Sequence, residues 1–199
     1  MDITDRVERL IVEHFPEARV QLVGSRQRGE QSALSDWDFR IDSPDCTGLV
    51  AELPSVAASL EPLGALWDPL SSRAVYMVVI PGAVKVDLFP GDEGQAIEPP
   101  WSPGRNNLVL IDAHFWDWTL WLGGKALRPG SDELIRGELV KMAGFLLGPL
   151  GAPHAPTTIS DAVRTYRTCR YESEQRYGLP VPRRIGDEVT DALRRHSLL

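Results

Sequence analysis

Apolar residues in the first half of the chain recur at helical spacing in two segments. They appear every three or four positions from Ile3 to Phe15, where Asp5 and Glu8 have the form of a reciprocal helix cap. A second such segment spans residues 49–63, and Pro54 either divides it or starts its second part. We therefore expect one helix near the N-terminus, and one broken helix or two short ones further on.

Outside these helices, the apolar residues of the first half are clustered or alternate with polar ones, which is typical of strands. The turn signal Pro81-Gly82 separates two segments rich in β-branched residues and predicts a hairpin. The predicted strands are residues 18–23, 36–41, 65–67, 73–80 and 83–89.

Strand-like alternation disappears in the second half of the chain. Residues 90–107 are rich in Gly and Pro, which suggests a domain boundary or a wall of a functional cleft. Helical spacing then predicts helices at residues 108–122, 132–147, 159–177 and 185–198. The predicted class is α+β, with a mixed sheet flanked by helices and a C-terminal helical bundle. The expected domains are residues 1–100 and 101–199.

Composition narrows the function classes. The chain has 199 residues with 21 basic and 28 acidic side chains, giving a net charge of −7. Such a surface repels polyanions, so we do not expect nucleic acid as a partner. Cys46 and Cys169 lie far apart and no secretory segment is evident, which favours free thiols in the cytoplasm. No apolar run approaches the ~20 residues of a membrane helix, so no membrane partner is expected.

The segment from Leu22 to Ile41 carries the first candidate chemistry. Gly24 allows close approach of the backbone, and Ser25 offers a hydroxyl and an N–H to an anion. Arg26 and Arg28 add positive charge, and Gly29 can end the turn in a left-handed conformation. This segment predicts a phosphate-binding turn between two strands.

Three carboxylates complete the candidate site. Asp36 and Asp38 share one face of the predicted strand, and such a pair of like charges is kept where it is solvated, shares a proton or binds a cation. Mg²⁺ takes carboxylate oxygens together with substrate phosphates. Asp87 lies on the hairpin strand, where an unpaired charge would be costly. The alternative for Asp87 is an ion pair with Arg73 or Arg40, and the alternative for the first two is a simple turn.

These residues resemble a known family. Gly24-Ser25-Arg26, Arg28-Gly29 and Ser35-Asp36-Trp37-Asp38-Phe39, followed by Val84–Phe89, are similar to the motifs of the DNA polymerase β-like nucleotidyltransferase superfamily. They look most like its small bacterial branch, which includes aminoglycoside and lincosamide nucleotidyltransferases. The resemblance covers residues 20–90 and implies transfer of a nucleoside monophosphate, AMP from ATP or its counterpart from another nucleoside triphosphate, to a hydroxyl of a small molecule.

The resemblance also assigns roles to individual residues. It implies two Mg²⁺ ions as cofactors. The implied catalytic and metal-binding residues are Asp36, Asp38 and Asp87, and the implied nucleotide-binding residues are Gly24, Ser25, Arg26, Arg28 and Ser35. Two alternatives stay open: transfer to a protein partner, as in antitoxin-type members, and nucleotide binding without turnover.

The helical half offers weaker candidates. Phe115, Trp116, Trp118 and Trp121 form an aromatic cluster that serves either as core or as a platform for a ring. Three cations that could reach a triphosphate, or simply be solvated, are Lys125, Arg128 and Lys141. Arg164, Arg167 and Arg170 predict a basic helix face paired with Asp161, Glu172 and Glu174. The scattered histidines do not predict a zinc site.

Overall fold

A computed structural model describes residues 2–92 and 94–199, so Glu93 of the predicted irregular segment 90–107 lies outside the described residues. The chain divides into two compact units. The sheet unit comprises Met1–Gln31 and Ser35–Glu98, and the helical unit comprises Ser32–Leu34 and Pro99–Leu199.

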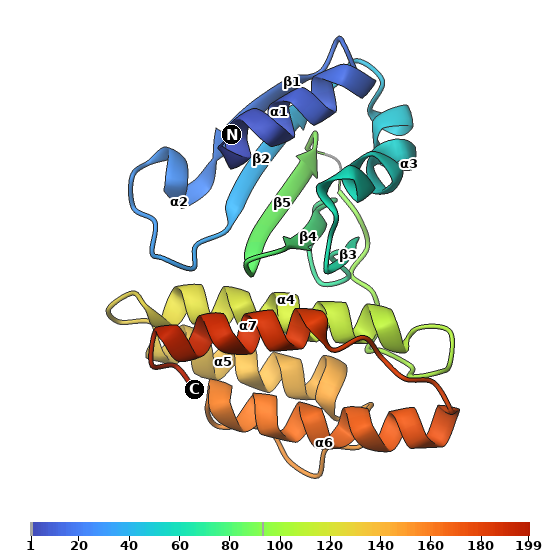
Figure 1. The fold of residues 1–199 in the computed structure, drawn as a ribbon, viewed down its shortest axis with the longest axis vertical. Coiled ribbons are helices and arrows are strands. Elements are labelled where there is room, and N and C mark those ends of the chain that lie inside the picture. Colours follow the sequence, from blue (N-terminus) through green and yellow to red (C-terminus); the bar gives the residue numbers. More distant parts are fainter. Residues whose placement is uncertain (1, 93) are drawn as a thin grey trace. The chain divides into compact units, whose positions relative to one another are not determined.

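Within the described residues, five strands of the sheet unit form one mixed sheet in the order β1-β2-β5-β4-β3 (Figure 1). The strands are β1 (Arg19–Val23), β2 (Trp37–Asp42), β3 (Gly64–Trp67), β4 (Tyr76–Ile80) and β5 (Val84–Pro90). The pair β2 and β5 is parallel, whereas the other neighbouring pairs are antiparallel. The predicted mixed sheet of an α+β protein is thus confirmed.

Helices α1 (Ile3–His14) and α3 (Cys46–Ala57) form a hydrophobic core with the sheet. The strand residues of this core include Phe39, Ile41, Val86 and Leu88. Because side chains alternate along a strand, the residues between them lie on the other face of the sheet. That face carries Asp38, Arg40, Lys85 and Asp87.

Two details of these helices differ from the prediction. The cap of α1 is Asp2, which accepts a hydrogen bond from the N–H of Ile3, and Asp5 lies inside the first turn. Pro54 does not divide α3, which continues to Ala57 and then forms a 3₁₀ turn, Ala58–Leu60. Burial of Leu49 and Leu53 before Pro54, and of Val56 and Ala57 after it, stabilises the helix despite the missing N–H.

Four strands begin later than predicted: β1, β2 and β5 by one residue, and β4 by three. Two of these shifts concern candidate residues of the site. Strand β2 begins at Trp37, so Asp36 directly precedes the strand and is not part of it. Strand β4 begins at Tyr76, and Arg73 upstream forms only an isolated bridge with Gly94.

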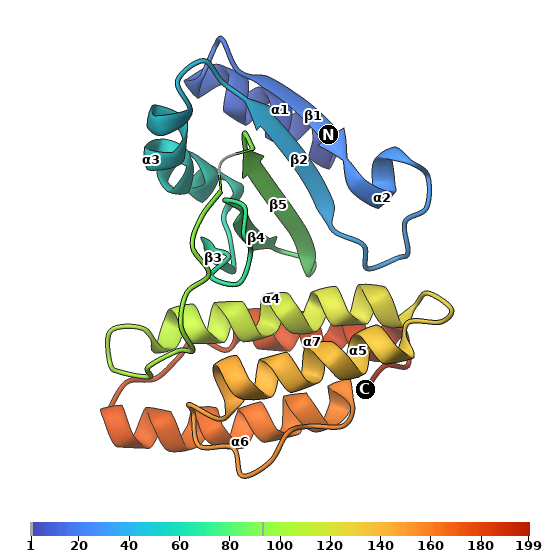
Figure 2. The same ribbon diagram turned by 180° about the vertical axis from the view of Figure 1, so that it is seen from behind.

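The helical unit contains α4 (Leu108–Ala126), α5 (Asp132–Met142), α6 (Ile159–Tyr177) and α7 (Arg184–Arg195), with a π-helical turn at Ala143–Leu147. Helix α4 contacts α5, α6 and α7. Figure 2 shows α5 next to α4. No helix in the described part of the chain has the length and hydropathy to cross a membrane.

A buried polar network links α4 to α6 inside the helical unit. One carboxylate oxygen of Asp112 accepts hydrogen bonds from Trp116 Nε1 (3.1 Å), the Tyr166 hydroxyl (2.6 Å) and Arg170 Nη1 (2.9 Å). Arg170 therefore lies in the core, where its shorter ion pair is with Asp112 and its predicted partner Glu174 lies 3.9 Å away. Arg164 does pair with Asp161 on the surface, as predicted.

Candidate active site

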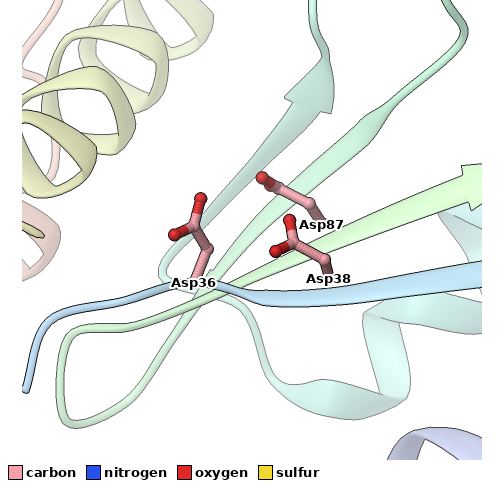
Figure 3. A group of neighbouring side chains, drawn as sticks. All are labelled: Asp36, Asp38 and Asp87. Atoms are coloured by element: carbon pink, nitrogen blue, oxygen red, sulfur yellow. The ribbon is translucent and has the colours of Figure 1, made fainter. Parts of the chain in front are cut away.

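The structure brings together the three carboxylates that the sequence singled out. Asp38 on β2 is the register partner of Asp87 on the parallel strand β5, and Asp36 lies in the loop just before β2. One ligand oxygen from each residue lies within 4.8 Å of the others. Figure 3 shows the three side chains converging from these two neighbouring segments. Asp36 and Asp87 are buried, with 9% and 7% of their surface exposed.

Lys85 is a fourth member of this cluster. Its Nζ donates a hydrogen bond to Oδ1 of Asp87 at 2.5 Å. Neither Arg73 nor Arg40 is the partner of Asp87, so both pairings considered from the sequence were wrong. The signal for Lys85 was present in the sequence, because a residue two positions before Asp87 on a strand shares its face.

Burial is the main influence on the charge of Asp87. Burial raises the pKa of this carboxyl, whereas the nearby Lys85 ammonium lowers it and the Asp36 carboxylate raises it further. The result is a pKa above the ordinary value. A raised pKa makes the ionised carboxylate a better proton acceptor.

The donor set fits a hard divalent cation. All three groups offer carboxylate oxygens, which Mg²⁺ prefers over nitrogen or sulfur ligands. Oxygens on opposite sides of a bound Mg²⁺ are about 4 Å apart. The ligand oxygens in the structure lie within 4.8 Å of one another, so only small side-chain shifts would let one ion contact more than one carboxylate.

The predicted phosphate-binding turn lies directly against the cluster. Gly24 opens the short helix α2 (Gly24–Gln27) with a φ of 72°, and Gly29 follows with a φ of 71°. A Cβ atom at Gly24 would lie 2.1 Å from Oδ2 of Asp38. The main chain at Gly24 can therefore approach the carboxylate only because the residue has no side chain. The adjacent Ser25 is buried.

Arg26 supports the loop that carries Asp36. Its Nε donates to the main-chain oxygens of Ser35 (3.1 Å) and Asp36 (3.0 Å), and its Nη2 donates to that of Ser35 at 2.6 Å. The guanidinium also lies over the ring of Trp37, 4.1 Å from the centroid. These contacts fix the loop just before β2. Arg28, in contrast, forms an exposed ion pair with Glu30 at 2.7 Å.

A pocket of about 350 Å³ opens beside the carboxylates in the sheet unit. Its lining includes Gly24 and Asp38 together with Arg40, Arg73 and Phe89. Arg40 is paired with Asp42 at 2.8 Å and with Asp92 at 3.0 Å. The pocket thus has the guanidinium of Arg73, the ion pair of Arg40 with Asp92 and the ring of Phe89 in its wall, next to the acidic cluster.

The weaker candidates of the helical half have structural roles. Trp116 and Trp118 are buried, and the Trp116 ring packs against Phe115 and Tyr166, which supports the core reading of the cluster. The ammonium of Lys125 lies over Trp121, and that of Lys141 pairs with Glu138. The buried network around Asp112 was not predicted from the sequence, although a charge within an apolar helix indicates a buried partner.

No family model and no curated protein sequence matches the chain. Solved structures that resemble part of it include one titled as a GLD-2/RNP-8 complex, with 13% identity and a TM-score of 0.37 over 61% of this chain. Another is titled as the polymerase core of TRAMP, an RNA surveillance complex, with 10% identity and a TM-score of 0.40 over 86% of this chain. This chain covers 39% and 55% of those two chains.

Proposed function

We propose that the protein is a Mg²⁺-dependent nucleotidyltransferase that moves AMP from ATP, or its counterpart from another nucleoside triphosphate, to a hydroxyl of a small molecule. The observation that carries this proposal is the group Asp36, Asp38 and Asp87, with ligand oxygens within 4.8 Å of one another beside the main chain of Gly24. The order and spacing of these motifs, similar to those of nucleotidyltransferases, support the same reading.

In the proposed reaction, the acceptor hydroxyl oxygen attacks the α-phosphorus of the triphosphate. The bond from this phosphorus to the oxygen that bridges to the β-phosphorus breaks, and pyrophosphate leaves. The hydroxyl proton passes to the carboxylate of Asp87 and then to solvent, a role that the raised pKa of Asp87 favours. A bound divalent ion would be held by the carboxylates and would stabilise the negative charge on the reacting phosphate.

The proposed nucleotide site is the pocket beside Asp38. Its volume, about 350 Å³, lies within the range of small-molecule sites. Arg73 would attract the triphosphate, and Phe89 offers an apolar surface to the base or the ribose. Arg40 would add a second cation once the phosphates displaced its partners Asp42 and Asp92. Gly24 allows the phosphates to approach the main chain without a side chain between them.

The acceptor is proposed from charge and resemblance together. The net charge of −7 favours cationic acceptors such as aminoglycosides and disfavours polyanions. Lincosamides are the second small-molecule class to test, and a protein acceptor would extend the same chemistry. The cytoplasm is the proposed compartment, because triphosphates and reduced thiols are both present there.

The test measures pyrophosphate release. The protein is incubated with Mg²⁺, each of the four triphosphates, and a panel of aminoglycosides, lincosamides, short RNA and purified proteins. We expect release only when an acceptor of the first two classes is present, and loss of release in excess EDTA or in Asp38→Asn. Pyrophosphate release with RNA as the only effective acceptor would show that the acceptor is RNA and not a small molecule. Absence of triphosphate binding in wild type would overturn the proposal as a whole.

A further inference from the structure

Lys85 is an unusual neighbour for three clustered carboxylates. Only 4% of its surface is exposed, and its register partner across the antiparallel pair β4 and β5 is the buried Val79. A buried ammonium is stable only when it is paired. The ammonium of Lys85 pairs with Asp87, which lies two residues along the same strand face. The chain therefore holds a fixed positive charge at one side of the acidic cluster.

The positive charge of Lys85 limits the number of divalent ions that the carboxylate cluster can hold. Three ionised carboxylates carry three negative charges, and one divalent ion together with Lys85 neutralises them. A second divalent ion would leave an excess of positive charge in a poorly solvated site, until a triphosphate supplied its own negative charge. Like charges that close repel strongly where water is scarce.

We propose that the ammonium of Lys85 takes the place of one divalent ion at Asp87, so that the nucleotide-free protein binds a single divalent ion through Asp36 and Asp38. Lys85 is then a positioning residue, because it holds the carboxylate of Asp87 in place without an ion. This inference rests on the proposed function, since it takes the carboxylate cluster as the metal site. It replaces the two resident ions implied by the family resemblance with one ion and one lysine.

The test counts bound Mn²⁺ ions in the absence of nucleotide, by calorimetric titration and by electron paramagnetic resonance. Wild type should bind one Mn²⁺ with the spectrum of an isolated ion. Lys85→Met removes the charge while keeping an unbranched side chain, and it should bind two ions whose spectra are broadened by spin coupling. Lys85→Arg keeps the charge and should again bind one ion.

Two bound ions in wild type, or one ion in a folded Lys85→Met, would overturn this inference and leave the proposed transfer intact. If Lys85→Met does not fold, as judged by circular dichroism, the wild-type and Lys85→Arg counts decide the question. The variant Asp38→Asn, which keeps Lys85, locates the counted ion, because it should no longer bind Mn²⁺. No bound ion in nucleotide-free wild type would overturn this inference and leave the proposed transfer to its pyrophosphate test, whereas one ion without nucleotidyl transfer would overturn only the function.

Discussion

At the scale of single residues, the contact between Gly24 and Asp38 is the sharpest constraint in the site. Gly24→Ala meets two penalties: a left-handed conformation, worth about 1–2 kcal/mol for a non-glycine residue, and a Cβ 2.1 Å from the Asp38 carboxylate. The carboxylate must move by about 1 Å to relieve this contact, and a misplacement of about 1 Å can cost on the order of 10²-fold in rate. We expect that loss in pyrophosphate release.

Gly29→Ala is the matched control for this substitution. Gly29 has nearly the same φ, 71°, but a Cβ there would meet nothing within 4 Å. Gly29→Ala should therefore lose stability in urea unfolding through its left-handed φ alone and keep its activity, whereas Gly24→Ala should lose at least as much stability and also lose activity. Equal activity losses would show that strain in the turn, and not the position of Asp38, limits the reaction.

Asp87 separates catalysis from binding. Asp87→Asn keeps an oxygen that can accept the hydrogen bond from Lys85 Nζ, but it removes the proton acceptor. A general base contributes roughly 10²–10⁴ to the rate, so kcat should fall by that factor while triphosphate affinity changes only a few-fold. Steady-state kinetics and calorimetry measure the two quantities. Near-full turnover in Asp87→Asn would exclude this residue as the base.

At the scale of elements, Arg26 joins the helix α2 to the loop before β2. Arg26→Lys cannot reproduce the fork of donors to the oxygens of Ser35 and Asp36. Loss of a contact that supports a metal ligand typically weakens metal binding about 10–100-fold, and we expect a loss in that range for Mn²⁺. Arg28→Lys alters only an exposed pair and should bind Mn²⁺ within about twofold of wild type. Equal losses would contradict this role of Arg26.

The start of α6 gives a pH-dependent prediction. Asp161 accepts a hydrogen bond from the N–H of Thr157 and pairs with Arg164, and both interactions lower the pKa of its carboxyl in the folded protein. Its stabilisation is therefore present above the ordinary pKa of about 3.9 and is lost as the pH falls through the lower folded value. Asp161→Asn keeps a hydrogen-bond acceptor but has no charge. Its urea midpoint should lie below that of wild type at pH 7, and the two should converge at acidic pH.

The same elements show what the sequence alone could predict. The limits of α6 coincide with the predicted residues 159–177, because long apolar periodicity and the cap at Thr158 are local signals. The predicted cap of α1 was wrong, because Asp2 and Asp5 are both suitable cap residues and the helix begins after Asp2. In the site, motif order brought out the three carboxylates. The pairing of Lys85 with Asp87 and the burial of Asp112 depend on tertiary contacts, which local patterns do not specify.

At the scale of the whole molecule, each unit holds a buried ionic cluster with a different balance of charge. The cluster of the sheet unit has three carboxylates and Lys85, and its excess negative charge suits an incoming cation. In the helical unit, Asp112 and Arg170 are paired, and Glu174 lies close to Arg170 and bonds to Arg183. Three donors bind one oxygen of the Asp112 carboxylate and Arg170 balances its charge, so that cluster needs no added ion.

The helical cluster should therefore control stability and not metal binding. Burial raises the pKa of Asp112, but the hydrogen bonds from Tyr166 and Arg170 oppose this shift. Asp112→Asn leaves the buried guanidinium of Arg170 without its close counter-charge, since its next carboxylate contact is 3.9 Å away. Breaking a buried pair costs about 3–5 kcal/mol, and urea unfolding followed by circular dichroism should show that loss.

Asp191→Asn is the control for this substitution, because it breaks an exposed pair with Arg194 and should cost less than about 1 kcal/mol. Below its unfolding transition, Asp112→Asn should bind Mn²⁺ as wild type does; equal stability of the two variants would show that the buried network contributes nothing.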